Sequence, residues 1–193
     1  MSGKTGPALR IRVARQDDVE ALLAIFALYV TQGTVSFEYQ VPTVSAFREK
    51  IAHILGDYPV FVALMGDAPV GYCYASRFRG QAAYDWAVET TIYIHPAHHG
   101  QGIGRRLYQT LEDALARQRV ITLYACISAA HAQSVAFHHH LGYREMARFQ
   151  GVGYKMGEWL DIIWMEKRLS PKPDKPDPFI PFGMLEQGDV GAV

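Results

Sequence analysis

The chain has 193 residues, and its 19 Lys and Arg balance 19 Asp and Glu. A protein that binds nucleic acid by neutralising phosphates would carry a basic surplus, so this balance argues against that class. With 49% hydrophobic and 20% charged residues, the composition is that of a globular protein and excludes a disordered one. The length predicts one domain with an appendage.

Neither export nor membrane insertion is indicated by the sequence. No apolar stretch follows the polar residues 1–7, and no run approaches about 18 apolar residues, so we expect no secretory signal and no spanning helix. Cys73 and Cys126 lie in apolar segments and are expected to be buried free thiols. These features together predict a cytoplasmic protein with no nucleic-acid or membrane partner.

Prolines concentrate near the C-terminus, where five of them follow Ser170. Such a segment cannot continue a helix or a central strand. We therefore expect a disordered segment 1–8, a folded domain 9–169 and a proline-rich tail 170–193 outside the fold. Because Phe179 and other apolar residues interrupt the tail, part of it could dock on the domain or on a partner.

Hydrophobic periodicity and turn residues predict the secondary structure of the domain. The expected strands cover 9–13, 60–65, 70–78, 88–95, 121–127, 143–152 and 159–167. The expected helices are one capped by Asp17 with a buried stripe to Val30, and others over 43–55, 105–118 and 132–141. The fold class is thus mixed α/β in the order β-αα-β-β-β-α-β-α-β-β, with an early antiparallel hairpin and a central crossover helix.

A glycine-rich turn joins the strand before Pro96 to the next helix. Gly100, Gly102 and Gly104 alternate there. Glycines let a ligand approach the backbone, and the first N–H groups of a helix are unpaired at the positive end of its dipole. The segment therefore predicts a phosphate or pyrophosphate cradle, with Arg105 adding positive charge. Its spacing fits neither the Gly-Lys-Ser/Thr phosphate loop nor the dinucleotide fingerprint.

Several collinear segments are similar to a known family. His99-Gly-Gln-Gly-Ile-Gly104 resembles the pyrophosphate loop of the GNAT superfamily of N-acetyltransferases. Segments 83–94, 134–143 and 152–161 are similar to its phosphinothricin and methionine sulfoximine acetyltransferase subfamily. The resemblance covers Leu9 to Leu169 and implies the GNAT fold, in which the mixed sheet splays apart at the acetyl-CoA site.

Acetyl-CoA is the co-substrate that the resemblance implies, without a metal. The pyrophosphate would lie on Gly100, Gln101, Gly102, Ile103, Gly104 and Arg105, and the pantetheine along the backbone of Ile92, Tyr93 and Ile94. His131 stands where relatives have an Asn that touches the cofactor. Consecutive histidines such as those at 138–140 diverge around a helix, which also argues against a metal site.

Two residues carry the chemistry that the resemblance implies. Glu89 would take a proton from the attacking amine, and a carboxylate among apolar strand residues tends to have a raised pKa. His138 would protonate the departing thiolate. Each such proton transfer is worth about 10²–10⁴-fold in rate.

The expected acceptor is a small amine that resembles an amino acid. Its candidate binding residues are Phe37, Arg79, Tyr84, Trp86 and Lys155. A guanidinium binds a carboxylate in bidentate fashion, so Arg79 is the first candidate for the acceptor's carboxylate, and the aromatic residues would wall the pocket. The resemblance also implies a homodimer. Two alternatives stay open: an N-acetyltransferase of protein N-termini or another small amine, and a CoA-binding module without turnover.

Overall fold

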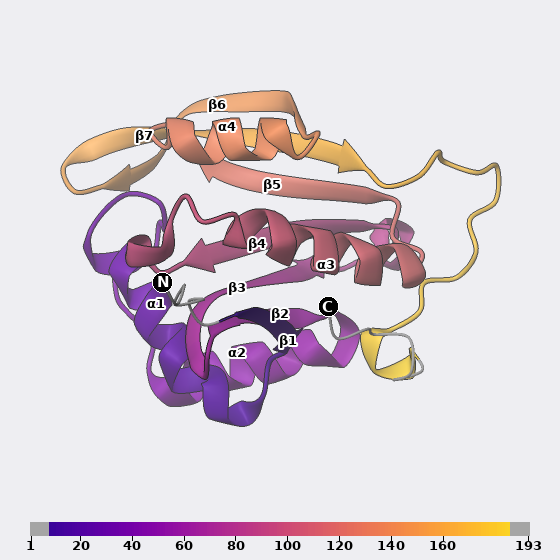
Figure 1. Cartoon of the computed structure of the whole chain (residues 1–193). Helices are drawn as coiled ribbons and strands as arrows, with labels where there is room; N and C mark the ends of the chain where they lie inside the picture. The colour runs from indigo at the N-terminus through magenta and orange to yellow at the C-terminus, as the bar shows by residue number, and fades with distance from the viewer. Residues whose placement is uncertain (1–7, 186–193) are drawn as a thin grey trace, which may run out of the picture.

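The computed structural model describes residues 8–185 as one mixed α/β sheet with helices on both faces (Figure 1). The strands are β1 (Leu9–Val13), β2 (Val60–Met65), β3 (Ala68–Arg77), β4 (Ala87–Ile94), β5 (Thr122–Ser128), β6 (Arg144–Lys155) and β7 (Glu158–Arg168). The helices are α1 (Val19–Thr31), α2 (Val44–Asp57), α3 (Ile103–Arg117) and α4 (Ala132–His140), with short 3₁₀ turns η1 (Gln16–Asp18), η2 (Ala82–Tyr84), η3 (Pro96–His98) and η4 (Phe182–Met184). Across the sheet the strands follow the order β1-β2-β3-β4-β5-β7-β6. The predicted element order and fold class are confirmed. Apart from Ala8, the segment 1–8 that we expect to be disordered lies outside the described residues.

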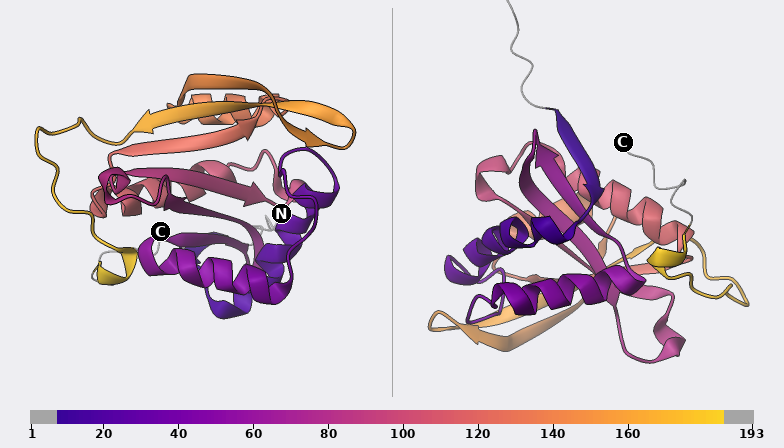
Figure 2. Two further views of the ribbon diagram at one scale, coloured as in Figure 1. Left: turned by 180° about the vertical axis from the view of Figure 1, so that it is seen from behind. Right: turned by 90° about the horizontal axis from the view of Figure 1, so that it is seen from below.

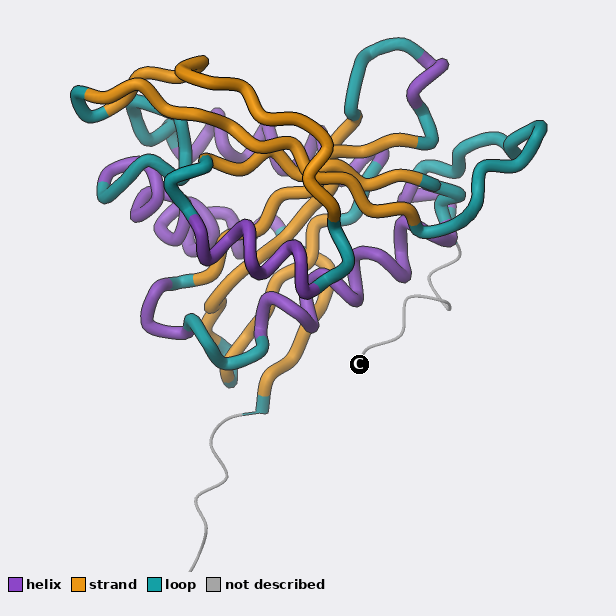
Figure 3. The backbone as a smooth tube through the Cα atoms, turned by 90° about the horizontal axis from the view of Figure 1, so that it is seen from above, coloured by secondary structure: helices purple, strands orange, loops and turns teal. Residues whose placement is uncertain are grey.

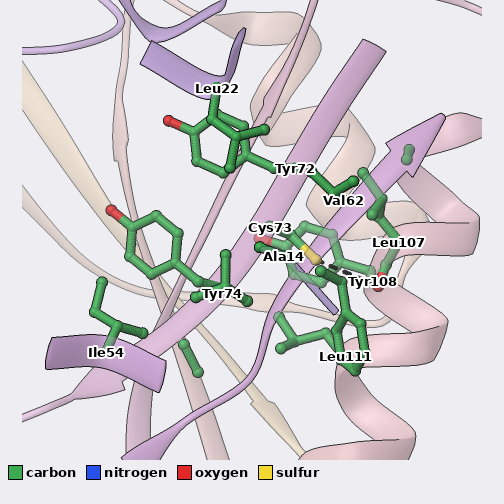
Figure 4. Packing of buried hydrophobic residues seen from close by; sticks show 14 of the residues in the cluster. Ala14, Leu22, Ile54, Val62, Tyr72, Cys73, Tyr74, Leu107, Tyr108 and Leu111 are labelled. Atoms are coloured by element: carbon green, nitrogen blue, oxygen red, sulfur yellow. Dashed lines mark hydrogen bonds between the residues drawn. The ribbon is translucent and has the colours of Figure 1, made fainter. Parts of the chain in front are cut away.

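Alternating side chains of the central strands bury both faces of the sheet. Tyr72 and Tyr93 are cross-strand partners, and Tyr93 packs against Phe26 of α1 with ring centroids 5.1 Å apart. The next residue of β3, Cys73, points to the other face, where its thiol donates to the carbonyl of Leu107 on α3 (Figure 4). Accordingly, α3 and α4 lie in front of the sheet in Figure 1, whereas α2 lies in front in the reverse view of Figure 2.

Strands β4 and β5 are adjacent at one end and separate toward the other (Figure 1). Their parallel pairing covers only residues 87–89 of β4 and 122–124 of β5, although both strands continue beyond it. The hydroxyl of Thr90 donates to the carbonyl of Tyr124 at 3.1 Å, so a side chain takes over where the ladder ends. The splay that the sequence predicts is therefore present and begins directly after Glu89.

Helix α1 begins later than predicted, and the expected cap at Asp17 is wrong. The carboxylate of Asp18 accepts the backbone N–H of Arg15 at 2.6 Å and the guanidinium of Arg12 at 2.6 and 2.8 Å. These bonds hold Gln16–Asp18 in a 3₁₀ turn, and the α-helix starts at Val19. The partner that decides the start is an arginine on β1, which helix-capping patterns do not consider.

Residues 170–185 of the C-terminal segment do not lie outside the fold as predicted, and the rest of the predicted tail, 186–193, is beyond the described residues. After β7 the chain runs as an extended segment and returns to the domain (Figure 3). There Phe179 packs on Tyr58 with ring centroids 5.3 Å apart, and Phe182 packs on Phe61 at 6.2 Å. The buried amide of Gln118 also donates to the carbonyl of residue 180 at 2.9 Å. Residues 178–185 are thus part of the domain, because they cover aromatic side chains that the rest of the fold leaves open.

Candidate active site

Two connected cavities open where β4 and β5 separate. The inter-strand cavity, on the α3–α4 side, is bordered by Thr90, Ile92, Tyr108, His131 and His138, among others. The α1–α2 cavity, on the opposite side, is bordered by Phe26, Phe37, Glu38 and Lys50, among others. Both cavities share Val35, Glu89, Tyr93, Cys126 and Ser128. Two molecules could therefore approach one another through the sheet from its two faces.

Glu89 occupies the junction between these cavities. It is the last residue of β4 that pairs with β5, and it is half-buried. Burial raises the pKa of Glu89, while the nearby charges of Arg79 and Lys50 lower it in part. A carboxylate with a raised pKa at the meeting point of two cavities suits a general base that works close to neutral pH.

His138 lies in a buried hydrogen-bond network beneath the inter-strand cavity. Its exposed fraction is 3%. The Nδ1 atom is 2.8 Å from the carbonyl oxygen of Ser134, and the Nε2 atom is 2.9 Å from the hydroxyl of Tyr108. That hydroxyl is also 3.3 Å from the hydroxyl of Thr90, which in turn is 3.2 Å from the hydroxyl of Tyr143.

The tautomer of His138 follows from these partners. A carbonyl only accepts, so Nδ1 carries the proton and Nε2 accepts the hydroxyl of Tyr108. Burial lowers the pKa of His138 to about 4, so the ring is neutral at physiological pH. In this state both ring nitrogens of His138 are engaged, and burial raises the pKa of Tyr108 well above its usual range, so the phenol keeps its proton.

The glycine loop has the backbone of an anion cradle. Gly100 and Gly102 have φ values of 74° and 75°, in the left-handed region that glycine adopts without strain. Gly102 directly precedes α3, which starts at Ile103 rather than at the predicted Arg105. Gly104 has another role, because a Cβ there would lie 3.0 Å from Phe137. The unpaired N–H groups of the first turn of α3 fit a pyrophosphate. Gln101 and Arg105 are exposed beside them.

The strand edge that is predicted to hold the pantetheine is free only in part. Ile92 and Tyr93 border the inter-strand cavity. The carbonyl of Ile94, however, accepts the hydroxyl of Tyr29 and Nε2 of His99, the latter at 3.0 Å. His99 therefore links the end of β4 to α1, and its ring is not directed at the glycine loop. His131 immediately precedes α4 and borders the cavity, and burial lowers its pKa.

One of the acceptor-binding candidates borders a cavity of Glu89, and another acts on Glu89 through its charge without bordering either cavity. Phe37 borders the α1–α2 cavity, and its ring packs so closely on Gly153 that a Cβ there would overlap it. Arg79 is exposed, with its guanidinium 4.5 Å from the ring centroid of Phe78, and its charge acts on Glu89.

Tyr84 and Trp86 do not join this group. Both border a separate groove with Pro173 and Pro176 of the C-terminal segment. The indole of Trp86 donates to the carbonyl of Asp177 at 2.7 Å. These two residues border neither cavity of Glu89, contrary to the predicted placement; the C-terminal segment binds Trp86, and Tyr84 stays exposed.

The ammonium of Lys155 has no N–H group left to bind an acceptor. Lys155 is 4% exposed, and its ammonium donates to the carbonyls of Val30, Gly33 and Ser36 at 2.8, 2.9 and 2.7 Å. All three N–H groups are thereby used. Lys155 instead fixes the loop between α1 and α2, which carries Phe37 into the cavity.

Sequence reasoning missed three residues that border the cavities: Lys50, Tyr108 and Cys126. The expectation that both thiols are buried is wrong for Cys126, which is exposed, whereas Cys73 is buried. On an amphipathic helix, Lys50 looks like any solvated lysine, and nothing in the sequence shows that β5 is no longer paired with β4 at Cys126. Among residues 8–185, no group of three or more His, Cys, Asp or Glu could hold a metal ion. The same residues contain no helix long and apolar enough to cross a membrane.

A splayed sheet, a glycine cradle at a helix start and a carboxylate at the splay define an acyl-CoA-dependent transferase. A family model described as an acetyltransferase (GNAT) domain matches residues 11–164. The chain belongs to the GNAT acetyltransferase superfamily and is an N-acetyltransferase with acetyl-CoA as its co-substrate.

Individual relatives and solved structures show which acetyltransferases of the superfamily the chain is similar to. The phosphinothricin N-acetyltransferase of Alcaligenes faecalis is 33% identical over 168 residues, which cover 84% of each chain. The L-methionine sulfoximine/L-methionine sulfone acetyltransferase of Salmonella typhimurium is 32% identical over 162 residues, 83% of this chain and 95% of the relative. The crystal structure of a phosphinothricin acetyltransferase from Sinorhizobium meliloti in complex with acetyl-CoA has a TM-score of 0.83 at 30% identity, covering 90% and 98% of the two chains.

Proposed function

We propose that the protein acetylates the primary amine of a small amino-acid-like acceptor of the phosphinothricin or methionine sulfoximine type, by direct attack of the amine on acetyl-CoA. The observation that carries the proposal is Glu89, which borders both cavities at the point where the sheet opens. The names of the relatives support the acceptor class.

The acceptor side of the reaction depends on Glu89 and Phe37. When bound, acetyl-CoA supplies the thioester carbonyl that the amine attacks. The amine enters from the α1–α2 cavity, where Phe37 forms a wall. Glu89 accepts a proton from the ammonium group, directly or through a water molecule, and its raised pKa favours this transfer near neutral pH. The backbone of Ile92 and Tyr93 and the N–H groups at Gly102 and Gly104 hold the co-substrate from the other cavity.

On the leaving-group side, we assign His138 a role that passes through Tyr108. A neutral His138 whose Nε2 accepts a hydrogen bond has no proton to give from that atom. It accepts the hydroxyl proton of Tyr108, which borders the same cavity, and we propose that this hydroxyl turns from His138 to donate its hydrogen bond to the sulfur as negative charge develops there. The hydroxyls of Thr90 and Tyr143 belong to the same hydrogen-bond network and help to hold the Tyr108 side chain in place.

We also propose a homodimer and a cytoplasmic location. The hairpin of β6 and β7 supports a dimer, because it exposes a set of large apolar side chains: Met146, Phe149, Val152, Tyr154, Met156 and Trp159. Trp159 is 69% exposed and lies on a strand pair at the edge of the sheet. Exposed apolar patches of this kind mark interaction sites. Light scattering after size-exclusion chromatography tests this, with a Trp159→Glu variant expected to shift the mass toward the monomer.

An acceptor screen with free-thiol detection tests the proposed activity. Acetyl-CoA is offered with phosphinothricin, methionine sulfoximine, methionine sulfone, a polyamine and a peptide with a free N-terminus. We expect the amino-acid analogues to release CoA fastest. Turnover with the peptide or the polyamine alone would overturn the proposed acceptor class, and no turnover with any amine would overturn the proposed activity.

A further inference from the structure

A lysine of α2 borders the α1–α2 cavity, through which the acceptor is proposed to enter. Lys50 borders the α1–α2 cavity together with Glu89 and Phe37. Its ammonium lies 5.9 Å from the ring centroid of Phe26 and 5.6 Å from that of Tyr74. Tyr74 is cross-strand partner to Thr91, two residues from Glu89 on the same face of β4. The ammonium is therefore held over the face of the sheet that carries the carboxylate.

We propose that Lys50 binds the α-carboxylate of the acceptor and thereby places its amine at Glu89. This inference rests on the proposed function and adds to it a specificity-determining residue. Lys50 is the cation among the residues that border the cavity, together with the carboxylates of Glu89 and Glu38, and its ammonium can pair with a carboxylate of the acceptor. Arg79 does not border the cavity, but its charge, like that of Lys50, acts on Glu89.

Other cations near the cavity are already engaged. The ammonium of Lys155 donates to three backbone carbonyls. The guanidinium of Arg77 pairs with Asp85 at 2.9 Å and with Asp57 at 3.4 Å. By contrast, the contacts of the Lys50 ammonium are the faces of two aromatic rings, which favour a cation there without occupying its N–H groups.

Glu38 is the group that could oppose an incoming carboxylate. It is exposed at the border of the same cavity, and its charge acts on Lys155 and Tyr93. Its repulsion would direct the carboxylate of the acceptor toward Lys50. The rest of the acceptor would then face Phe37, which favours the uncharged side chain of methionine sulfoximine or methionine sulfone over the anionic phosphinate of phosphinothricin.

The arrangement predicts a preference for acceptors with a free carboxylate. In wild-type enzyme, L-methionine sulfone should have a lower KM than its carboxamide, which keeps the amine and the side chain but lacks the charge. Lys50→Met should raise the KM of the acid roughly tenfold, the size expected for loss of one charge-assisted contact, and change kcat and the KM of the amide little. Lys50→Arg should retain most of the preference.

Steady-state kinetics on the full chain with both acceptors, at saturating acetyl-CoA, tests the inference. Lys175→Met, in the exposed C-terminal segment, is the matched control for loss of a lysine and should leave both KM values unchanged. An unchanged KM for the acid in Lys50→Met, or equal losses for acid and amide, would overturn the role of Lys50. Absence of turnover by wild-type enzyme with either acceptor would instead overturn the proposed function, and this inference with it.

Discussion

Replacing Lys155 by Met should destabilise the protein even though the change lies beside a substrate cavity. The buried ammonium donates to the carbonyl of Val30 at the end of α1 and to those of Gly33 and Ser36 in the loop between α1 and α2. A hydrogen bond to a charged group contributes about 1.5–3 kcal/mol, but removal of a buried charge returns part of this sum. We therefore expect a net loss of about 3 kcal/mol, which lowers Tm by about 6–12 °C in a domain of this size.

Thermal unfolding without any acceptor is the decisive assay, because the hydrogen bonds of Lys155 stabilise the free protein. The KM for the acceptor should also rise, because the loop that carries Phe37 is loosened, while acetyl-CoA affinity should stay the same. Lys172→Met, in the C-terminal segment, provides a lysine control. An unchanged Tm combined with a raised acceptor KM would refute the reasoning and return Lys155 to the list of acceptor ligands.

Three further predictions concern the catalytic pair and the C-terminal segment. Glu89→Gln should lower kcat by about 10²–10⁴-fold while calorimetry shows unchanged acetyl-CoA affinity; in the wild type, kcat/KM should fall on acidification at a pH above the usual carboxylate range, because burial raises the pKa of Glu89. His138 has a pKa of about 4 in the fold and an ordinary one when unfolded, so the unfolded state binds more protons and stability should fall by about 3 kcal/mol as pH decreases from about 6.5 to about 4. Urea unfolding across this range should show a smaller loss for His138→Gln, and an equal loss would contradict the buried neutral ring. Phe182→Ala should cost about 2 kcal/mol without loss of activity, whereas Met184→Ala, at a side chain that is 77% exposed, should cost nothing measurable.

The fold could be predicted from sequence because its signals are local. Alternating apolar residues define the strands, and the helix expected over 43–55 is present and capped by Thr43, whose hydroxyl accepts the N–H of Ala46 at 3.2 Å. The start of α1 was beyond such reasoning, because Asp18 is bound by an arginine from β1.

The site was predictable only in part, because only some of its residues are placed by local sequence signals. Glu89 and the glycine loop follow from one strand and the turn after it. The roles of Lys155 and Trp86 depend instead on segments more than 80 residues away in the chain, the α1–α2 loop and the C-terminal segment. Lys50 belongs to a helix whose sequence gives no sign of the cavity that it borders.

Product formation is the most direct test of the central claim, that Glu89 serves amine acetylation at the splay between β4 and β5. Purified protein is incubated with acetyl-CoA and L-methionine sulfoximine, and the N-acetylated product is quantified by mass spectrometry together with the released thiol. We predict equal amounts of both for the wild type and a loss of about 10²–10⁴-fold in their rate for Glu89→Gln. Thiol release without acetylated amine, or an unimpaired Glu89→Gln variant, would contradict it.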